Sequence, residues 1–211
     1  MTELVFILDR SGSMHGLEQD TIGGFNSMLE RQKKDDDLAY VSTVLFAGQS
    51  EVIHDRLRLE DVPALTERDY RVGGCTAMLD AIGDAIRHIG NIHKYARPED
   101  RPAKTLFAIT TDGMENASRR YGYDQVKAMI ECRQQEYGWE FLFLGANIDT
   151  AREAARFGIR ADRAADYYAD SKGTGVIYES VCEAVSQVRC CAPLAADWKK
   201  AIDRDYQERK R

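Results

Sequence analysis

The chain has 211 residues, enough for one domain with a sizeable core but too few for two. Hydrophobic residues make up 44% of it and charged residues 30%, which excludes a disordered chain. The net charge of -6 argues against nucleic acid or an anionic membrane as a partner. No apolar run reaches the ~20 residues that span a bilayer, and the N-terminus lacks a signal-peptide pattern, so we expect a cytoplasmic protein with no membrane partner.

The first elements predict a buried strand followed by an amphipathic helix. Residues 4–9 are almost continuously apolar, as expected for a strand that is covered on both faces. A helical stripe of apolar residues follows over 17–29, and the charged run 33–37 reads as a solvated turn.

A hairpin comes next. Strand-like runs occupy 40–48 and 51–59, and the Gly-Gln-Ser turn between them is so short that the two strands must be antiparallel. One edge strand of the sheet should therefore run backwards. A helix with a clear apolar stripe then begins at Met78, which places residues 73–76 in the loop just before it.

The second half repeats the alternation of strands and helices. It contains predicted strands at 104–113, 139–147 and near Tyr167, and predicted helices at 123–136, 150–157 and 176–188. This order predicts an α/β fold: a Rossmann-like, doubly wound, mostly parallel six-stranded sheet with one antiparallel edge strand and helices on both faces.

We place the domain at residues 1–191 and a C-terminal helical extension at 192–211. The extension carries a stripe that should pack onto the parent domain, formed by Leu194, Trp198, Ile202 and Tyr206. The five cysteines are an odd number without framework spacing, so we expect reduced thiols that act as small buried core residues.

Three polar loops lie where a strand ends or a helix begins: DRSGS at 9–13, GGCT at 73–76 and TTDG at 110–113. In an open α/β sheet, ligands bind beyond the carboxyl ends of the strands where the strand order reverses, so these loops should meet there. A carboxylate and two hydroxyls on the first loop could hold a metal, activate a nucleophile or cap the following helix.

The three loops together favour the metal. Their donors are all hard oxygens, which suit Mg²⁺, with Mn²⁺ or Ca²⁺ as alternatives, and disfavour zinc and copper. Two carboxylates only neutralise a divalent ion, so the ion stays electrophilic and can accept a carboxylate from another protein. The predicted ligands are Asp9, Ser11, Ser13, Thr76 and Asp112.

These residues resemble the von Willebrand factor A domain and its metal-ion-dependent adhesion site, whose motif is D-x-S-x-S followed by a distant Thr and a distant Asp. The resemblance covers residues 2–188. It implies direct ligation by the two serines and the threonine, aspartates that act partly through water, and a sixth position filled by an Asp or Glu of a partner protein. The segments GGCTAMLDAI and TTDGMEN look most like bacterial intracellular members, some of which belong to stress-response or tellurite-resistance gene clusters.

Residues beside the ligands form the predicted partner-binding rim: Met14, His15, Gly74, Cys75, Gly113, Glu115 and Asn116. Glu115 and Asn116 could tune the rim, steady the loop or simply be exposed. Cys75 has no basic neighbour, so we expect its thiol to pack beneath the loop and not to be reactive.

Other functions fit less well. A haloacid-dehalogenase-type Mg²⁺-dependent phosphohydrolase needs a second acid two residues after the first, where this chain has Ser11. The G-x-S-x-G elbow of serine hydrolases and the P-loop motif are both absent from the sequence. A third possibility is a scaffold that acts through its C-terminal helix. We therefore expect a non-catalytic, metal-dependent protein-interaction module.

Overall fold

The computed structural model describes residues 1–210, and within them one mixed sheet has the strand order β3-β2-β1-β4-β5-β6. β3 is antiparallel to β2, and all other neighbouring strands are parallel, which confirms the predicted fold class. The strands are β1 (Thr2–Asp9), β2 (Ala39–Phe46), β3 (Ser50–Arg58), β4 (Lys104–Thr111), β5 (Glu140–Ala146) and β6 (Ala164–Tyr167).

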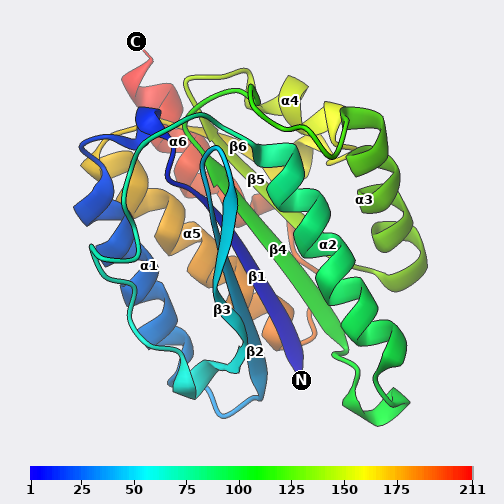
Figure 1. Ribbon diagram of the computed structural model, residues 1–211. Coiled ribbons are helices and arrows are strands. Elements are labelled where there is room, and N and C mark those ends of the chain that lie inside the picture. Colours follow the sequence, from blue (N-terminus) through cyan, green and yellow to red (C-terminus); the bar gives the residue numbers. More distant parts are fainter. Residues whose placement is uncertain (211) are drawn as a thin grey trace.

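Helices cover both faces of this sheet (Figure 1). The cores on the two faces show that α1, α5 and α6 pack on one face, and α2, α3 and α4 on the other. The helices are α1 (Glu18–Gln32), α2 (Met78–Tyr95), α3 (Tyr123–Tyr137), α4 (Thr150–Arg156), α5 (Ser171–Arg189) and α6 (Lys200–Arg209).

The packing of β1 between two layers of helices explains why its sequence is continuously apolar. Successive side chains of a strand point to opposite faces, so Leu4 and Phe6 join the core under α1 and α5, while Val5 and Ile7 join the core under α2. Burying each such side chain stabilises the fold by about 1.5–3 kcal/mol. β1 is therefore the centre of both cores.

The strand order reverses at β1. Along the chain β1 leads to β2 on one side, whereas its other neighbour, β4, is reached only after β3 and α2. The loops that leave the carboxyl ends of β1 and β4 consequently lead to helices on opposite faces of the sheet, at the upper end of Figure 1.

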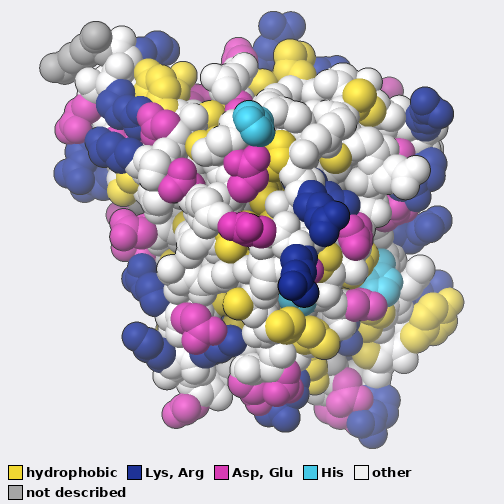
Figure 2. All heavy atoms as spheres, turned by 60° about the vertical axis from the view of Figure 1, so that its left-hand side comes forward, with side chains coloured by type: hydrophobic (Ala, Val, Ile, Leu, Met, Phe, Trp, Pro, Cys, Tyr) yellow, Lys and Arg dark blue, Asp and Glu magenta, His cyan; other side chains and the backbone are white. Residues whose placement is uncertain are grey.

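The antiparallel edge is irregular. The register between β2 and β3 shifts on both sides of Thr43, and Arg56 adopts a left-handed backbone conformation with φ 48°. β3 also carries several charged side chains, and Val52 is 51% exposed. Figure 2 shows acidic and basic side chains interspersed over the face of the molecule that it presents.

The C-terminal extension packs onto the domain, as its apolar stripe predicts. Leu194, Trp198 and Ile202 are buried in the same core as α1 and α5. The Trp198 indole Nε1 donates a hydrogen bond to the Asp162 carbonyl at 2.8 Å, and Lys199 Nζ donates to the Ala164 carbonyl at 2.7 Å. The extension thus covers β6, the short strand at the other edge.

Two expectations need correction. α5 begins at Ser171 and not at Val176, because the Asp170 side chain accepts a hydrogen bond from Gly173 N and caps an additional turn whose glycines conceal its helical character in the sequence. Cys182 is buried as predicted, but Cys190 and Cys191 are exposed where α5 ends. The helix stops there, so these two thiols have no core to enter.

Within the described residues, none of the helices combines the length and the apolar content that crossing a membrane requires.

The buried position of Trp198 leads to a stability prediction. Trp198→Ala removes a large core side chain and its hydrogen bond, and should lower the free energy of unfolding by about 3–5 kcal/mol in urea titrations. Lys200→Ala, at an exposed position two residues away, should change it by less than about 0.5 kcal/mol. Equal stability of the two variants would show that the extension does not stabilise the domain.

Candidate metal centre

Asp9 is the last residue of β1, and its carboxylate is held from two directions. Its side chain is 0% exposed. Oδ1 accepts a hydrogen bond from Ser11 N at 2.7 Å, and Oδ2 accepts one from the Thr111 hydroxyl at 2.7 Å. The Tyr70 hydroxyl donates to the Asp9 carbonyl. The orientation of this carboxylate is thus fixed by β4 and by the loop that follows β1.

The serines follow on a tight turn. Ser11 is buried and Ser13 is exposed, and their hydroxyl oxygens lie 3.1 Å apart. The 3-10 turn Gly12–Met14 makes this spacing possible, and the Met14 side chain is buried and anchors the turn. Two hydroxyls from one short loop therefore lie side by side next to Asp9.

The loop before α2 pairs with the serine loop through its backbone. Gly73 N donates to the Arg10 carbonyl at 2.9 Å, and Gly12 N donates to the Gly74 carbonyl at 3.1 Å. Gly74 has φ 81°, a left-handed conformation that favours glycine. These two bonds place Thr76, which is 4% exposed, beside the serine loop.

The loop after β4 completes the arrangement. Thr76 N donates to Asn116 Oδ1 at 2.9 Å, and the Thr76 carbonyl accepts from Asn116 N at 3.0 Å. A β-carbon on Gly113 would lie 3.4 Å from Ser13 Oγ and 3.9 Å from Thr76 Oγ1. The structure thus brings all the predicted ligands to one place: Asp9, Ser11, Ser13, Thr76 and Asp112.

The two carboxylates are buried without a basic partner. Asp112 is 4% exposed, and it accepts a hydrogen bond from Asn147 Nδ2. Burial raises the pKa of Asp9. Burial also raises the pKa of Asp112, and the negative charge of Asp9 raises it further. Neither forms a salt bridge with any residue in 1–210.

This donor set fits a hard divalent cation. Unpaired buried carboxylates are costly, and a doubly charged ion would neutralise both. Residues 1–210 contain no group of three or more His, Cys, Asp and Glu side chains that could hold a metal, so the hydroxyls of Ser11, Ser13 and Thr76 would have to supply the remaining protein ligands.

The predicted rim is only partly at the surface. His15, Gly74, Cys75 and Asn116 are exposed, and Gly113 and Glu115 are half-buried. Met14 is 3% exposed, so its side chain anchors the loop and does not form part of the rim. Cys75 does not pack beneath the loop as we expected, because the backbone bonds of the neighbouring glycines hold this segment over the serine loop and leave the thiol outside.

Glu115 and Asn116 steady the loop. The Glu115 carboxylate accepts hydrogen bonds from Leu79 N at 2.8 Å, in the first turn of α2, and from Ser118 N at 2.7 Å. Asn116 holds Thr76 through its side chain and its backbone. Asp80 likewise accepts from the backbone N–H groups of Arg120 and Tyr121. The loop after β4 is therefore tied to the start of α2.

Four residues of this centre escaped the sequence prediction. Thr111 and Asn147 orient the two carboxylates, Tyr70 fixes the end of β1, and Met114 is 57% exposed beside the site. Asn147 gives a signal in hindsight, because an Asn directly after a buried strand often has the left-handed conformation seen here, φ 56°. Tyr70 lies in an irregular loop whose sequence has no periodicity.

Comparison with solved structures identifies the fold, although no family model and no curated protein matches the chain. The chain is similar to a von Willebrand factor type A protein from Catenulispora acidiphila, with 15% identity, a TM-score of 0.58, and coverage of 87% of this chain and 42% of that one. It is similar to the ArnB paralog VWA2 from Sulfolobus acidocaldarius, with 18% identity, a TM-score of 0.54 and coverage of 86% and 44%.

A third neighbour is proximal thread matrix protein 1 from the mussel byssus, in a structure whose metal-ion-dependent adhesion motif is occupied by zinc. Its identity is 13%, its TM-score is 0.57, and the coverage is 86% of this chain and 45% of that one. The chain thus has the von Willebrand factor A fold, and it spans less than half of each of these structures.

The unpaired carboxylates lead to a prediction for Asp112→Asn. An asparagine can still accept the bond from Asn147, but it removes a buried negative charge. In EDTA the variant should therefore melt at a higher temperature than the wild type. Adding Mg²⁺ should raise the melting temperature of the wild type and not that of the variant. A variant that is less stable in EDTA would contradict the electrostatic argument.

Thr111→Val tests the orientation of Asp9. Valine has nearly the same shape, but it cannot donate to Asp9 Oδ2, so the free energy of unfolding should fall by about 1–3 kcal/mol. Mg²⁺ should still raise the melting temperature of the variant, but a higher Mg²⁺ concentration should be needed to reach the full increase. An unchanged Mg²⁺ dependence would show that this hydrogen bond does not position the carboxylate.

Proposed function

We propose that this protein is a non-catalytic, divalent-metal-dependent protein-interaction module, in which Asp9, Ser11, Ser13, Thr76 and Asp112 hold the ion and an Asp or Glu of a partner protein completes it. The observation that carries the proposal is the pair of buried carboxylates without a basic partner, beside three hydroxyls. The fold of the neighbours and the zinc-occupied motif in one of them support divalent-metal binding.

The charges explain why a carboxylate would be the preferred ligand from the partner. Asp9 and Asp112 balance the two positive charges of the ion, and hydroxyls are neutral donors, so a bound ion would retain affinity for an anion. Ser13 is exposed, which leaves that side of the centre accessible from solvent. We propose Mg²⁺ as the ion, because its ligands are hard oxygens.

The remaining chain positions this centre. Ser11 N and Thr111 hold the Asp9 carboxylate, Asn147 holds Asp112, and Asn116 holds Thr76. The donors would therefore need little reorganisation on binding the ion, and little conformational entropy would be lost.

The same geometry disfavours the alternatives. A phosphohydrolase would need Asp9 as a free nucleophile, but its side chain is 0% exposed and both of its oxygens accept hydrogen bonds. A scaffold that acts through its C-terminal helix would need the apolar stripe at the surface, but Trp198 and Ile202 are buried against the domain.

On the resemblance of the loop sequences, we propose that the protein belongs with bacterial intracellular members of the stress-response or tellurite-resistance type.

The proposal is tested by capturing partners from a lysate with the full chain as bait. A partner retained in Mg²⁺ should be lost in EDTA and should not bind Ser13→Ala, whose exposed position leaves the fold intact. Asp36→Ala, which removes an exposed acid remote from the site, should retain the partner. Substituting the acidic residues of the partner one at a time should then identify one that is required.

Capture that is equal in EDTA and Mg²⁺, and equal for Ser13→Ala and wild type, would overturn the proposal. Mg²⁺-dependent turnover of p-nitrophenyl phosphate that is lost in Asp9→Asn would overturn its non-catalytic part.

A further inference from the structure

A second concave site lies far from the metal centre. A cavity of about 490 Å³ opens where α2 ends and where β5 begins. The metal centre borders the start of α2 at Met78, and the cavity borders the turns from Gly90 to Lys94, so at ~1.5 Å per residue roughly 18–24 Å of helix separates the two sites. Ligand pockets usually have volumes of about 300–1,000 Å³, so this cavity is large enough for a small molecule. Its lining residues are Gly90, Asn91, His93, Lys94, Arg101, Pro102, Arg133, Tyr137 and Trp139.

The lining is basic although the chain is acidic. The cavity is lined by His93, Lys94, Arg101 and Arg133, and by no Asp or Glu, in a chain with a net charge of -6. Within residues 1–210, Lys94, Arg101 and Arg133 form no salt bridge. His93 Nε2 lies 3.1 Å from the carboxylate of Glu3, which is fully buried and also pairs with Arg56 at 2.9 Å, so the uncompensated charge belongs to the other three residues. The cavity therefore holds positive charge that no carboxylate neutralises.

Part of this charge has a structural role, and part does not. Arg101 Nε donates to the Ala96 carbonyl at 3.1 Å, which stabilises the end of α2. Lys94 donates no hydrogen bond to another described residue, and its ammonium lies over the ring of Tyr95, at 5.3 Å. The Arg133 guanidinium packs on the rings of Tyr137 and Trp139 and against Gly90, and it donates no hydrogen bond to another residue in 1–210. Lys94 and Arg133 are thus the cations that remain available to a ligand.

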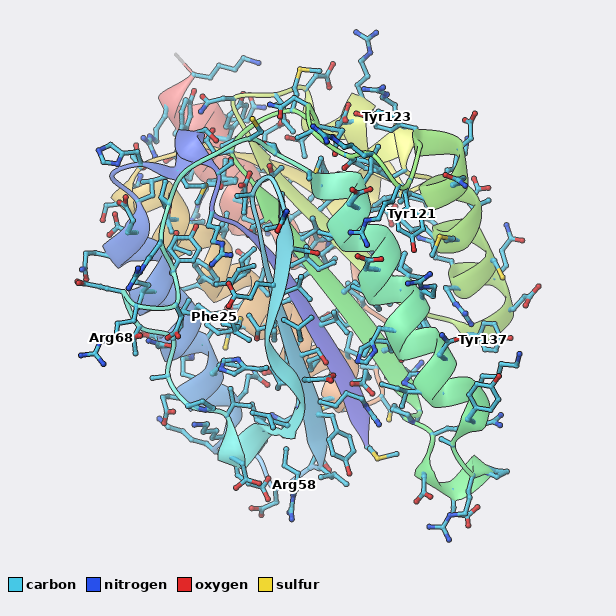
Figure 3. All side chains as sticks on the ribbon, viewed as in Figure 1. Phe25, Arg58, Arg68, Tyr121, Tyr123 and Tyr137 are labelled. Atoms are coloured by element: carbon cyan, nitrogen blue, oxygen red, sulfur yellow. The ribbon has the colours of Figure 1, made fainter. Side chains whose placement is uncertain are left out.

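The guanidinium of Arg133 lies between two aromatic rings. Its central carbon is 4.9 Å from the Tyr137 ring centre and 5.1 Å from that of Trp139. A β-carbon on Gly90 would collide with this guanidinium, so the glycine makes room for it. Trp139 is buried, whereas Tyr137, at the end of α3 in Figure 3, is 57% exposed. Arg133 is therefore pre-oriented with its N–H donors free, next to an exposed aromatic face.

From this arrangement we propose that the cavity binds a small phosphorylated molecule with a planar ring, of the mononucleotide class. Lys94 and Arg133 bind the phosphate, because an ammonium and a guanidinium both form charge-assisted hydrogen bonds with phosphate oxygens. The ring stacks on the exposed face of Tyr137. The site does not depend on the metal centre.

Calorimetric titration of AMP and of inorganic phosphate into the full chain, in EDTA, tests the assignment. Both should bind saturably, with AMP tighter. Lys94→Gln and Arg133→Gln should each weaken both ligands about tenfold or more, since a hydrogen bond to a charged group contributes ~1.5–3 kcal/mol. Lys127→Gln, the same charge change at a residue of α3 that does not line the cavity, should bind AMP like the wild type.

Tyr137→Ala distinguishes the contribution of the ring from that of the phosphate. It should weaken the binding of AMP and leave the binding of inorganic phosphate unchanged. Ser13→Ala, which alters the proposed metal centre, should bind AMP like the wild type. Loss of metal-dependent partner binding can therefore be told apart from loss of AMP binding in the cavity. The proposal is wrong if neither ligand binds saturably, or if Lys94→Gln, Arg133→Gln and Lys127→Gln bind AMP equally. Lys94 is exposed, so its variant remains informative even if Arg133→Gln fails to fold.

Discussion

The arrangement of this molecule depends on two carboxylates placed close together at the point where the strand order reverses. Asp9 ends β1 and Asp112 directly follows the adjacent parallel strand β4, and neither has a basic partner in residues 1–210. Three donors hold them there, namely Ser11 N, the Thr111 hydroxyl and the Asn147 amide. The surrounding loops thus hold two carboxylates close together, as the proposed binding of a divalent cation would require.

The fold could be predicted because its signals are local. Continuous apolar runs marked the buried strands, and the short turn after Gly48 required the antiparallel edge. The meeting of the five predicted ligand residues could be predicted for the same reason, since each lies in a loop that follows a strand or precedes a helix. Tyr70 and Asn147 could not, because their roles arise from contacts between residues that are distant in sequence. The outward position of Cys75 likewise depends on how two loops pair.

The two ends of α2 have opposite electrostatic character. Its first turn receives the Glu115 carboxylate and borders the acidic metal centre, whereas its last turns border a cavity lined by Lys94 and Arg133. A helix attracts anions at its N-terminus and cations at its C-terminus, so both ends follow the helix dipole. Asp9 and Asp112 are the charges that would bind the proposed ion near one end, and Lys94 and Arg133 are those that would bind the proposed phosphate at the other.

The irregular edge at β3 has a consequence for self-association. A long, flat edge strand offers unpaired N–H and C=O groups to any other chain and can seed cross-β aggregates. Here the shifted register and the charged side chains Glu51, Asp55 and Arg58 make β3 a poor template for another strand. At the opposite edge, Lys199 and Trp198 cover β6. With both edges of the sheet protected, addition of a strand from a second copy of this chain is a poor route to self-association.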